Sequence, residues 1–559
     1  MKHTLSICLA LVFSTLLSAA PEERKGFDWT EVSEIAIQER GRLKPLDTFS
    51  RETVQFITGK TSWKTFSAIE CIFGWLTNFD KEWDDEPIIR VDYEALKTEL
   101  GFEKDQKYFT LKAVRDNPKL MKLVRQAAEK ERTKEKLSDL ERKTLILANQ
   151  KNMLEMIISG DALTIFPNPK GMSEPWFALT SLNEPGGLPY PPESMQLLGT
   201  SLKSLIDGFL KKDAFAWKKG AVDFGSVLRV DLAKGQYPTV SDLKREIHYN
   251  HLRPFRWAWV LYTLAFILIL AAIVTNHRVL KNVSFGTLLL GFGLHAYGFV
   301  IRCLVSGRPP VTNMYESVIW VTWGCVLFSL LIWLQYKNLA IPAAAVVFSI
   351  VGLVLADNTP VVLDPSIHPL EPVLRSNLWL TIHVLTITLS YAAFALSLCL
   401  GNVVLGFYLF KPKQVPTVQQ YTLYMYRAIQ IGVVLLAAGT ILGGVWADYS
   451  WGRFWGWDPK EVWALTALLL YVAVLHGRFA GWLRGFGFAT TTVFCFLGVL
   501  MAWYGVNFVL GAGLHSYGFG SGGMGYVGAY VALQIAFVIL AYLKYRESGS
   551  STAPIFPKK

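Results

Sequence analysis

One short segment of the sequence alternates tryptophan with glycine and carries two acids. It holds five of the chain's 19 tryptophans within 18 residues, namely Trp446, Trp451, Trp455, Trp457 and Trp463. Such rings can form a flat surface against which a large planar ligand packs. A tryptophan belt at the membrane boundary is the alternative, but it requires neither the glycines nor Asp458 and Glu461. We interpret these two acids as residues that orient the segment or cap the following helix, in preference to an acid–base pair.

Two histidines flank the tryptophan segment. His383 lies in an apolar stretch before it, and His515 lies among glycines after it. A histidine in or beside a membrane is costly unless it is hydrogen-bonded or binds a ligand. For either histidine alone, the simpler interpretation is a structural residue held by hydrogen bonds. Together they predict two axial ligands to one haem iron, because neutral imidazole is a common haem ligand.

Membrane-spanning helices must position these residues. The chain has 559 residues, of which 52% are hydrophobic and 18% charged, against about 25% charged in an average soluble protein. Since a span needs about 20 apolar residues, we predict an α-helical polytopic membrane protein with about nine transmembrane helices. They are expected at 257–275, 284–304, 315–334, 339–356, 378–410, 428–445, 462–480, 486–510 and 524–543. This composition excludes a disordered chain, a collagen-like chain and a disulfide-rich scaffold.

The pattern predicts four regions. Residues 1–20 resemble a signal peptide or anchor, 21–254 an exported, mainly helical soluble domain, 255–545 the transmembrane domain, and 546–559 a cytoplasmic tail. Within the soluble domain, the charged segment 119–151 predicts an amphipathic helix or helical hairpin, and seven prolines predict an irregular segment over 166–194. A further helix is expected to be capped near Asp47 or Thr48.

The distribution of charge orients the chain. Residues 255–559 contain 18 lysines and arginines against eight acids, so they hold a net +10 of the total +11. With the soluble domain outside, the inner loops and tail hold twelve cations and the outer ends six, as the positive-inside rule requires. We therefore interpret the net positive charge as a signal for the orientation of the chain in the membrane, and we expect no nucleic-acid partner. The sequence contains no CxxC or CxxCH motif, which excludes a thioredoxin-like reductant and a self-attached c-type haem, and we interpret the cysteines as small buried apolar residues.

Three motifs carry a family resemblance. WGRFWGWDPKEVWAL at residues 451–465 resembles the WWD signature of the haem-handling cytochrome c assembly family. GRPPVTNMYES at 307–317, GLHSYG at 513–518 and the flanking histidines resemble its system II, Ccs-type branch. The similarity covers roughly 255–545, and residues 40–50 resemble an exported segment of some long members.

The resemblance implies a holocytochrome c synthetase (cytochrome c haem lyase) of the bacterial inner membrane. It would export haem b and present it on the periplasmic side for attachment to the CxxCH motif of apocytochrome c. The implied external iron ligands are His383 and His515, and the intramembrane ligand is His476, with His295 either a second ligand or a structural histidine. The implied haem platform is Trp446, Trp451, Trp455, Trp457, Asp458 and Trp463. Arg308, Arg375 and Arg453 are candidate partners of the haem propionates, or else topological anchors.

Other functions are compatible with parts of this pattern. A haem exporter or chaperone-loading subunit without ligase activity would share the site. A b-type electron-transfer protein with bis-histidine haems would not need the tryptophan segment, and a non-haem transporter would be expected to show repeats. The sequence lacks the membrane-anchored module of the long fused family members, unless residues 21–253 partly replace it. We therefore expect a second membrane assembly subunit, besides apocytochrome c and an external thiol reductant.

Overall fold

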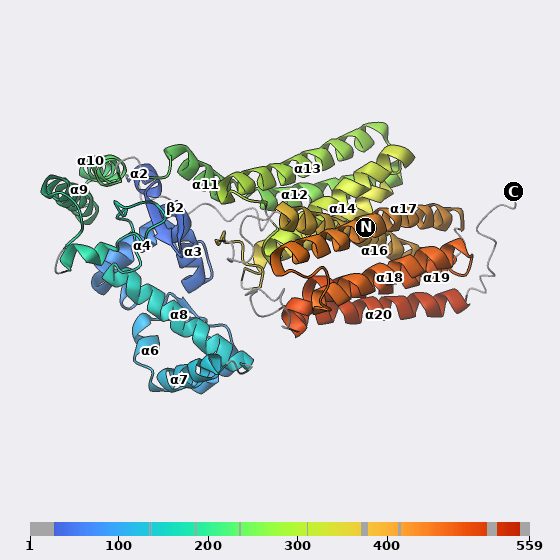
Figure 1. The fold of residues 1–559 in the computed structure, drawn as a ribbon, viewed down its shortest axis with the longest axis horizontal. Helices are drawn as coiled ribbons and strands as arrows, with labels where there is room; N and C mark the ends of the chain where they lie inside the picture. The colour runs from blue at the N-terminus through green and yellow to red at the C-terminus, as the bar shows by residue number, and fades with distance from the viewer. Residues whose placement is uncertain are drawn as a thin grey trace. The chain divides into compact units, whose positions relative to one another are not determined.

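The computed structural model describes residues 27–133, 135, 137–184, 187–233, 236–309, 311–360, 362–369, 378–411, 415–510 and 523–547. The chain divides into two compact units, Met1–His251 and Leu252–Lys559, near the predicted division at 254 (Figure 1). The predicted signal peptide or anchor at 1–20 and residues 548–559 of the predicted tail lie outside the described residues.

The first unit is mainly helical, as predicted. Its α-helices are α2 (Thr30–Ser33), α3 (Leu46–Thr58), α4 (Ala68–Asn78), α5 (Glu94–Leu100), α6 (Leu111–Arg115), α7 (Pro118–Arg132), α8 (Asp139–Ser159), α9 (Pro192–Leu210), α10 (Ala214–Ser226) and α11 (Val240–Leu252). Shorter π- and 3₁₀-helical turns are η1 (Phe79–Trp83), η2 (Leu179–Asn183) and η3 (Val227–Leu232). Antiparallel strand pairs are β1 (Ala36–Glu39) with β2 (Arg42–Pro45), β3 (Ser62–Trp63) with β4 (Phe66–Ser67), and β5 (Ile89–Arg90) with β6 (Tyr108–Phe109).

Two local predictions in this unit have opposite outcomes. The charged segment 119–151 forms the helical hairpin of α7 and α8, and a capping box of Ser138 and Glu141 starts the second helix. The predicted cap of α3 is wrong, because the helix begins at Leu46 directly after the extended Pro45. Asp47 instead accepts a hydrogen bond from Arg51, and the Thr48 hydroxyl accepts one from Asn250 of α11.

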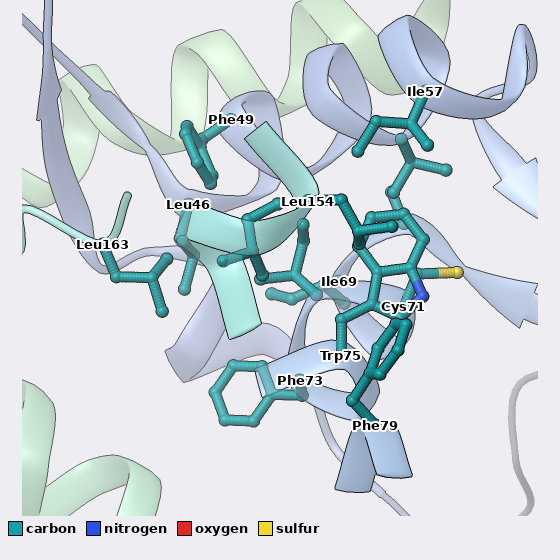
Figure 2. Packing of buried hydrophobic residues seen from close by; sticks show 14 of the residues in the cluster. Leu46, Phe49, Ile57, Ile69, Cys71, Phe73, Trp75, Phe79, Leu154 and Leu163 are labelled. Atoms are coloured by element: carbon teal, nitrogen blue, oxygen red, sulfur yellow. The ribbon is translucent and has the colours of Figure 1, made fainter. Parts of the chain in front are cut away.

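The core of the first unit lies where α3, α4 and α8 meet. Figure 2 shows Phe49 of α3, Trp75 of α4 and Leu154 of α8 among its side chains, and all three are essentially buried. Cys71 of α4 lies in the same core, and burial raises the pKa of its thiol. The five described cysteines are free, which fits the interpretation of cysteine as a small apolar residue.

The second unit is a bundle of long helices that lie side by side (Figure 1). They are α12 (Pro254–Thr275), α13 (Arg278–Ser306), α14 (Met314–Tyr336), α15 (Ala340–Asn358), α16 (Leu378–Phe410), α17 (Val415–Trp451), α18 (Pro459–Phe479), α19 (Gly485–Leu500) with its π-helical continuation η5 (Met501–Leu510), and α20 (Met524–Glu547). Within the described part of the chain, nine helices are long and apolar enough to cross a membrane. Each predicted span overlaps one of them, which confirms the polytopic α-helical membrane fold.

Glycines bring α16 and α17 into close contact. A Cβ atom added at Gly432 would lie 2.5 Å from Cε1 of Phe394, and one at Gly439 would lie 2.9 Å from the Cα atom of Ile387. Small residues permit this backbone approach between membrane helices. α16 is also tied to α20 by a reciprocal amide pair, because Asn402 and Gln534 each donate to the other at 3.0 and 2.8 Å.

The tryptophan segment is a helix, a loop and a second helix, whereas the predicted spans at 428–445 and 462–480 place nearly all of it in one loop between them. α17 continues past the apolar stretch 428–445 to Trp451, and α18 begins at Pro459. The helix continues because its backbone hydrogen bonds do not depend on apolar side chains. It ends at Gly452, whose φ of 68° is the left-handed conformation that commonly terminates a helix.

Candidate functional site

A cavity of about 200 Å³ opens among the elements that flank the tryptophan loop. Its walls come from the segment before α14 and the start of α14, from α16, α17 and α18, from the loop between α17 and α18, and from η5. Among its lining residues are Arg308, His383, Trp446, Trp455, Lys460 and Trp503. The structure thus brings together four of the predicted site residues, which come from three separate stretches of the chain.

His383 lies in the second turn of α16, and its ring is fixed by α17. The Nδ1 atom donates to the carbonyl oxygen of Gly439 at 2.7 Å. Because a carbonyl can only accept, the proton of the neutral ring is on Nδ1 and the lone pair is on Nε2, which is the form that binds iron. The ring is parallel to that of Trp446, with an angle of 6° and centroids 6.4 Å apart.

Two glycines make room for this arrangement. A Cβ atom at Gly443 would lie 2.6 Å from Cε1 of His383, and one at Gly444 would lie 2.5 Å from Cζ of Phe454. Both distances are shorter than real carbon–carbon contacts. The glycine pair therefore allows His383 and Phe454 to lie directly against α17.

The five tryptophans have different surroundings. Trp446 is buried and packs edge-on against Trp451 at 4.6 Å, while Trp455 lines the cavity and packs edge-on against Trp457 at 5.9 Å. Trp457 is 71% exposed. Trp463 is partly buried and packs against the core of the bundle. Two rings of the predicted platform therefore line the cavity, two pack against those rings, and Trp463 faces the helices.

The two acids cap α18, as we expected. Asp458 is the N-cap residue and accepts from the backbone N–H of Lys460 at 3.0 Å. Glu461 completes the capping box by accepting from the N–H of Asp458, and it also accepts from the N–H of Gly456 at 2.8 Å. The same carboxylate forms an ion pair with Arg453 at 3.3 Å. The cap therefore holds the loop between α17 and α18.

A charge cluster lies beside the cavity. The buried Glu316 pairs with the buried Arg302 at 2.9 Å and with the cavity-lining Arg308 at 3.3 Å. Arg302 and Arg308 also donate to the carbonyl oxygens of Pro365 and His368, both at 2.9 Å. Two guanidinium groups share one carboxylate here, so the group as a whole is cationic.

The two intramembrane histidines differ in their hydrogen bonding. His295 of α13 is fully buried, donates from Nε2 to the carbonyl oxygen of Ile319 at 3.1 Å, and faces the Tyr262 hydroxyl with Nδ1 at 3.3 Å. His476 of α18 is exposed on the bundle and donates from Nδ1 to the carbonyl oxygen of Val472 at 2.9 Å. His476 thus has the tautomer of His383, whereas the lone-pair nitrogen of His295 faces a tyrosine. The neighbours of His295 come from α12, α13 and α14, and the structure does not bring it together with His476.

Comparisons with known proteins identify the family of the chain. A family model described as cytochrome c assembly protein matches residues 311–515. CcsA, a cytochrome c biogenesis protein of Prochlorococcus marinus, is 36% identical over 265 residues, which cover 42% of this chain and 83% of that protein. The chain belongs to the CcsA family of cytochrome c biogenesis proteins. The CcsA protein of a Synechococcus strain is 34% identical over 249 residues.

A longer relative matches this CcsA-family chain over both units. NrfI of Wolinella succinogenes is 31% identical over 522 residues, which cover 89% of the chain. The match covers 54% of NrfI, so the chain spans about half the length of that relative.

The sequence analysis did not identify several residues that line the cavity. Lys460, Trp503 and Asn507 line the cavity, and the last two lie on the π-helical η5. The Gly443-Gly444 pair, which begins three residues before Trp446, was a local signal that other side chains pack closely against this helix. His515 and Arg375 lie outside the described residues.

Proposed function

We propose that this chain binds haem b as its substrate at the outer face of the bundle and presents it to apocytochrome c. His383 and His515 bind the iron there, and the tryptophans beside the cavity pack against the porphyrin. The observation that carries the proposal is the Nδ1–H bond of His383 to Gly439, since it leaves the lone pair on Nε2 of a residue that lines the cavity.

The charge around the cavity supports a haem substrate. Haem carries two propionate carboxylates, and Arg guanidinium groups suit carboxylates well. Arg308 lines the cavity and belongs to a cluster in which two arginines share Glu316. Arg453, the second described candidate, is already paired with Glu461. This favours Arg308 over Arg453 as a propionate partner, and Arg375 stays a candidate from the sequence.

We further propose that haem reaches this site from the inner side of the membrane. The tautomer of His476 supports its assignment as the intramembrane ligand, because its Nε2 carries the lone pair. The two hydrogen-bonding contacts of His295 favour the structural alternative for that residue. The inside cation excess supports an orientation with the cavity on the periplasmic side of a bacterial inner membrane.

The attachment reaction itself places few demands on this chain. Each CxxCH thiol adds across one haem vinyl group, so that sulfur bonds to the carbon next to the ring and hydrogen to the terminal carbon. The chain positions the substrate and binds its iron. Burial raises the pKa of the Cys71 thiol, which disfavours the reactive thiolate form. We include an external thiol reductant as a partner because the sequence contains no CxxC motif, and we keep the second membrane subunit that the family resemblance led us to expect.

Covalent haem attachment tests the proposal. The chain is expressed with a CxxCH apocytochrome in a host that lacks its own cytochrome c assembly genes, with and without the expected partner subunit. Variants His383→Ala and His515→Ala are compared with His277→Ala, a control at the N-cap of α13. We expect attachment to require His383 and His515, added imidazole to restore it partly, and the control to match the wild type.

The other results identify the alternatives. Haem that co-purifies without attachment, even with the partner present, would indicate an exporter or a chaperone-loading subunit. Bound haem that cycles between redox states and is insensitive to His383→Ala and to His515→Ala would indicate a b-type electron-transfer protein. A well-folded chain that binds no haem would refute the proposal.

A further inference from the structure

The first unit contains a small pocket with a buried carboxylate in its wall. The pocket has a volume of about 10 Å³, which is about the space of one water molecule. It is lined by Phe66 of β4, Glu70 and Gly74 of α4, Glu82 and Trp83 of η1, and Phe209 of α9. Glu82 is exposed, and Phe66 and Phe209 are half-buried. The pocket therefore lies close to the surface of the unit.

The fold uses one oxygen of Glu70 and leaves the other without a partner. Glu70 is 3% exposed, and its Oε2 atom completes the capping box of α4 by accepting from the backbone N–H of Ser67 at 2.7 Å. Its Oε1 atom is buried, and no described residue forms a hydrogen bond with it. A buried carboxylate oxygen without a donor is unfavourable. A ligand that donates to Oε1 would remove this cost.

The charge beside the pocket favours a cationic ligand. Segment 80–85, which includes the lining residues Glu82 and Trp83, holds four acids against one lysine, a net charge of −3. Asp80, Asp84 and Asp85 have no ion pair with any residue in the described ranges. A surface with this excess of negative charge attracts a basic stretch of a partner and repels an anionic one.

The walls of the pocket suit an ammonium group on an alkyl chain. The rings of Phe66 and Trp83 lie 5.1 Å apart at an angle of 54°, and aromatic rings attract ammonium groups and pack against alkyl chains. The Nε1 atom of Trp83 also has no partner, but it lies against α4, since a Cβ atom at Gly74 would be 2.7 Å from it. An ammonium group is compact, whereas a guanidinium group is a wide planar fork. The pocket therefore fits lysine better than arginine.

We infer that this pocket is a docking site for a lysine side chain of a partner polypeptide, whose ammonium group donates to Oε1 of Glu70. The acids of segment 80–85 attract the basic stretch that carries the lysine, and the aromatic walls contact its alkyl chain. The inference concerns the first unit alone. It goes beyond the proposed function and does not depend on haem binding.

Peptide binding to the full chain tests this site. A fluorescein-labelled peptide of Gly-Ser-Lys repeats is titrated with the chain, purified in a neutral detergent, and its fluorescence anisotropy is measured. Two matched peptides carry arginine or Nε-acetyl-lysine in place of lysine. The proteins compared are the wild type, Glu70→Gln and the control Glu99→Gln. Glutamine also closes a capping box, so Glu70→Gln keeps the helix cap, and Glu99 is an exposed acid of α5 whose substitution removes the same charge.

We expect the wild type to bind the lysine peptide more tightly than the other two. Glu70→Gln should weaken binding of the lysine peptide on the order of tenfold or more, with little effect on the arginine peptide, and Glu99→Gln should match the wild type.

Each other result decides against the inference. Equal losses for the lysine and arginine peptides in Glu70→Gln would mean that the carboxylate attracts cations without admitting lysine to the pocket. Unchanged binding of the lysine peptide in folded Glu70→Gln would mean that the pocket holds a water molecule only. The three peptides also test the wild type without any variant, because a lysine peptide that binds no more tightly than the arginine peptide overturns the inference.

Discussion

A single added methyl group at Gly443 should displace the proposed iron ligand. The new Cβ would lie 2.6 Å from Cε1 and 2.9 Å from Nδ1 of His383. Carbon atoms in favourable contact are about 3.5 Å apart, so the ring of His383 must move by about 0.9 Å. The bond from Nδ1 to Gly439, now 2.7 Å, would then exceed hydrogen-bonding distance if the shift is along it.

The expected magnitude follows from the role of that bond. Loss of the group that orients a metal-binding histidine typically lowers metal affinity about 10- to 100-fold. We therefore expect Gly443→Ala to weaken haem binding by about 1.4–2.8 kcal/mol. Covalent haem attachment should fall in parallel, because a shift of about 1 Å in a reacting group can cost a hundredfold in rate.

The assay is a haem titration of purified protein, followed by absorbance, together with thermal unfolding of each variant. The matched control is Gly406→Ala in α16, where an added Cβ meets no atom within 4 Å. Wild-type haem affinity and an unchanged spectrum in folded Gly443→Ala would refute the reasoning, because the ring would then have room that the structure does not give it. A loss in the control of the same size would also refute it.

Substitutions at three further residues test the surroundings of the cavity. Glu316→Ala leaves two guanidinium groups without their shared carboxylate and should destabilise the bundle by roughly 3–5 kcal/mol, measured by unfolding in detergent; an unchanged midpoint would contradict this. Asp458→Ala should lower the free energy of unfolding by about 1 kcal/mol. Asp458→Ser should lower it much less, because serine also caps helices; equal losses in the two variants would exclude a capping role. Burial raises the pKa of Asp364, but hydrogen bonds from His368 and Ser366 outweigh this and lower it to about 2. Its stabilising effect should therefore be complete above about pH 4 and disappear toward pH 2, and Asp364→Asn should remove this pH dependence from the unfolding free energy.

The membrane helices were predictable because the bilayer imposes a simple rule. Every backbone polar group in the hydrocarbon layer must bond internally, so apolar stretches of spanning length are helices. The rule does not describe the chain beyond the bilayer. α17 continues through Asp448 and Tyr449, which are exposed, and this placed Trp446 and Trp451 on a helix where we expected a loop.

The candidate site was predictable only in part. His383 and Trp446 stand out by residue type, and the structure places their rings parallel. Lys460 and Trp503 have no local pattern that marks them, because the cavity is formed by elements that are distant in the sequence. The roles of histidines also depend on their hydrogen bonds, which distinguish His295 from His476 and have no counterpart in residue spacing.

The helix cap of α18 has a kinetic consequence. The carboxylate of Glu461 accepts from Gly456 and Asp458 and pairs with Arg453, so the loop that carries Trp455 is fixed when the helix forms. Little of this loop then has to be ordered when a ligand arrives, and ordering flexible chain is a major cost of association. The loop that carries Trp455 should therefore add no slow rearrangement of its own to ligand association at this cavity.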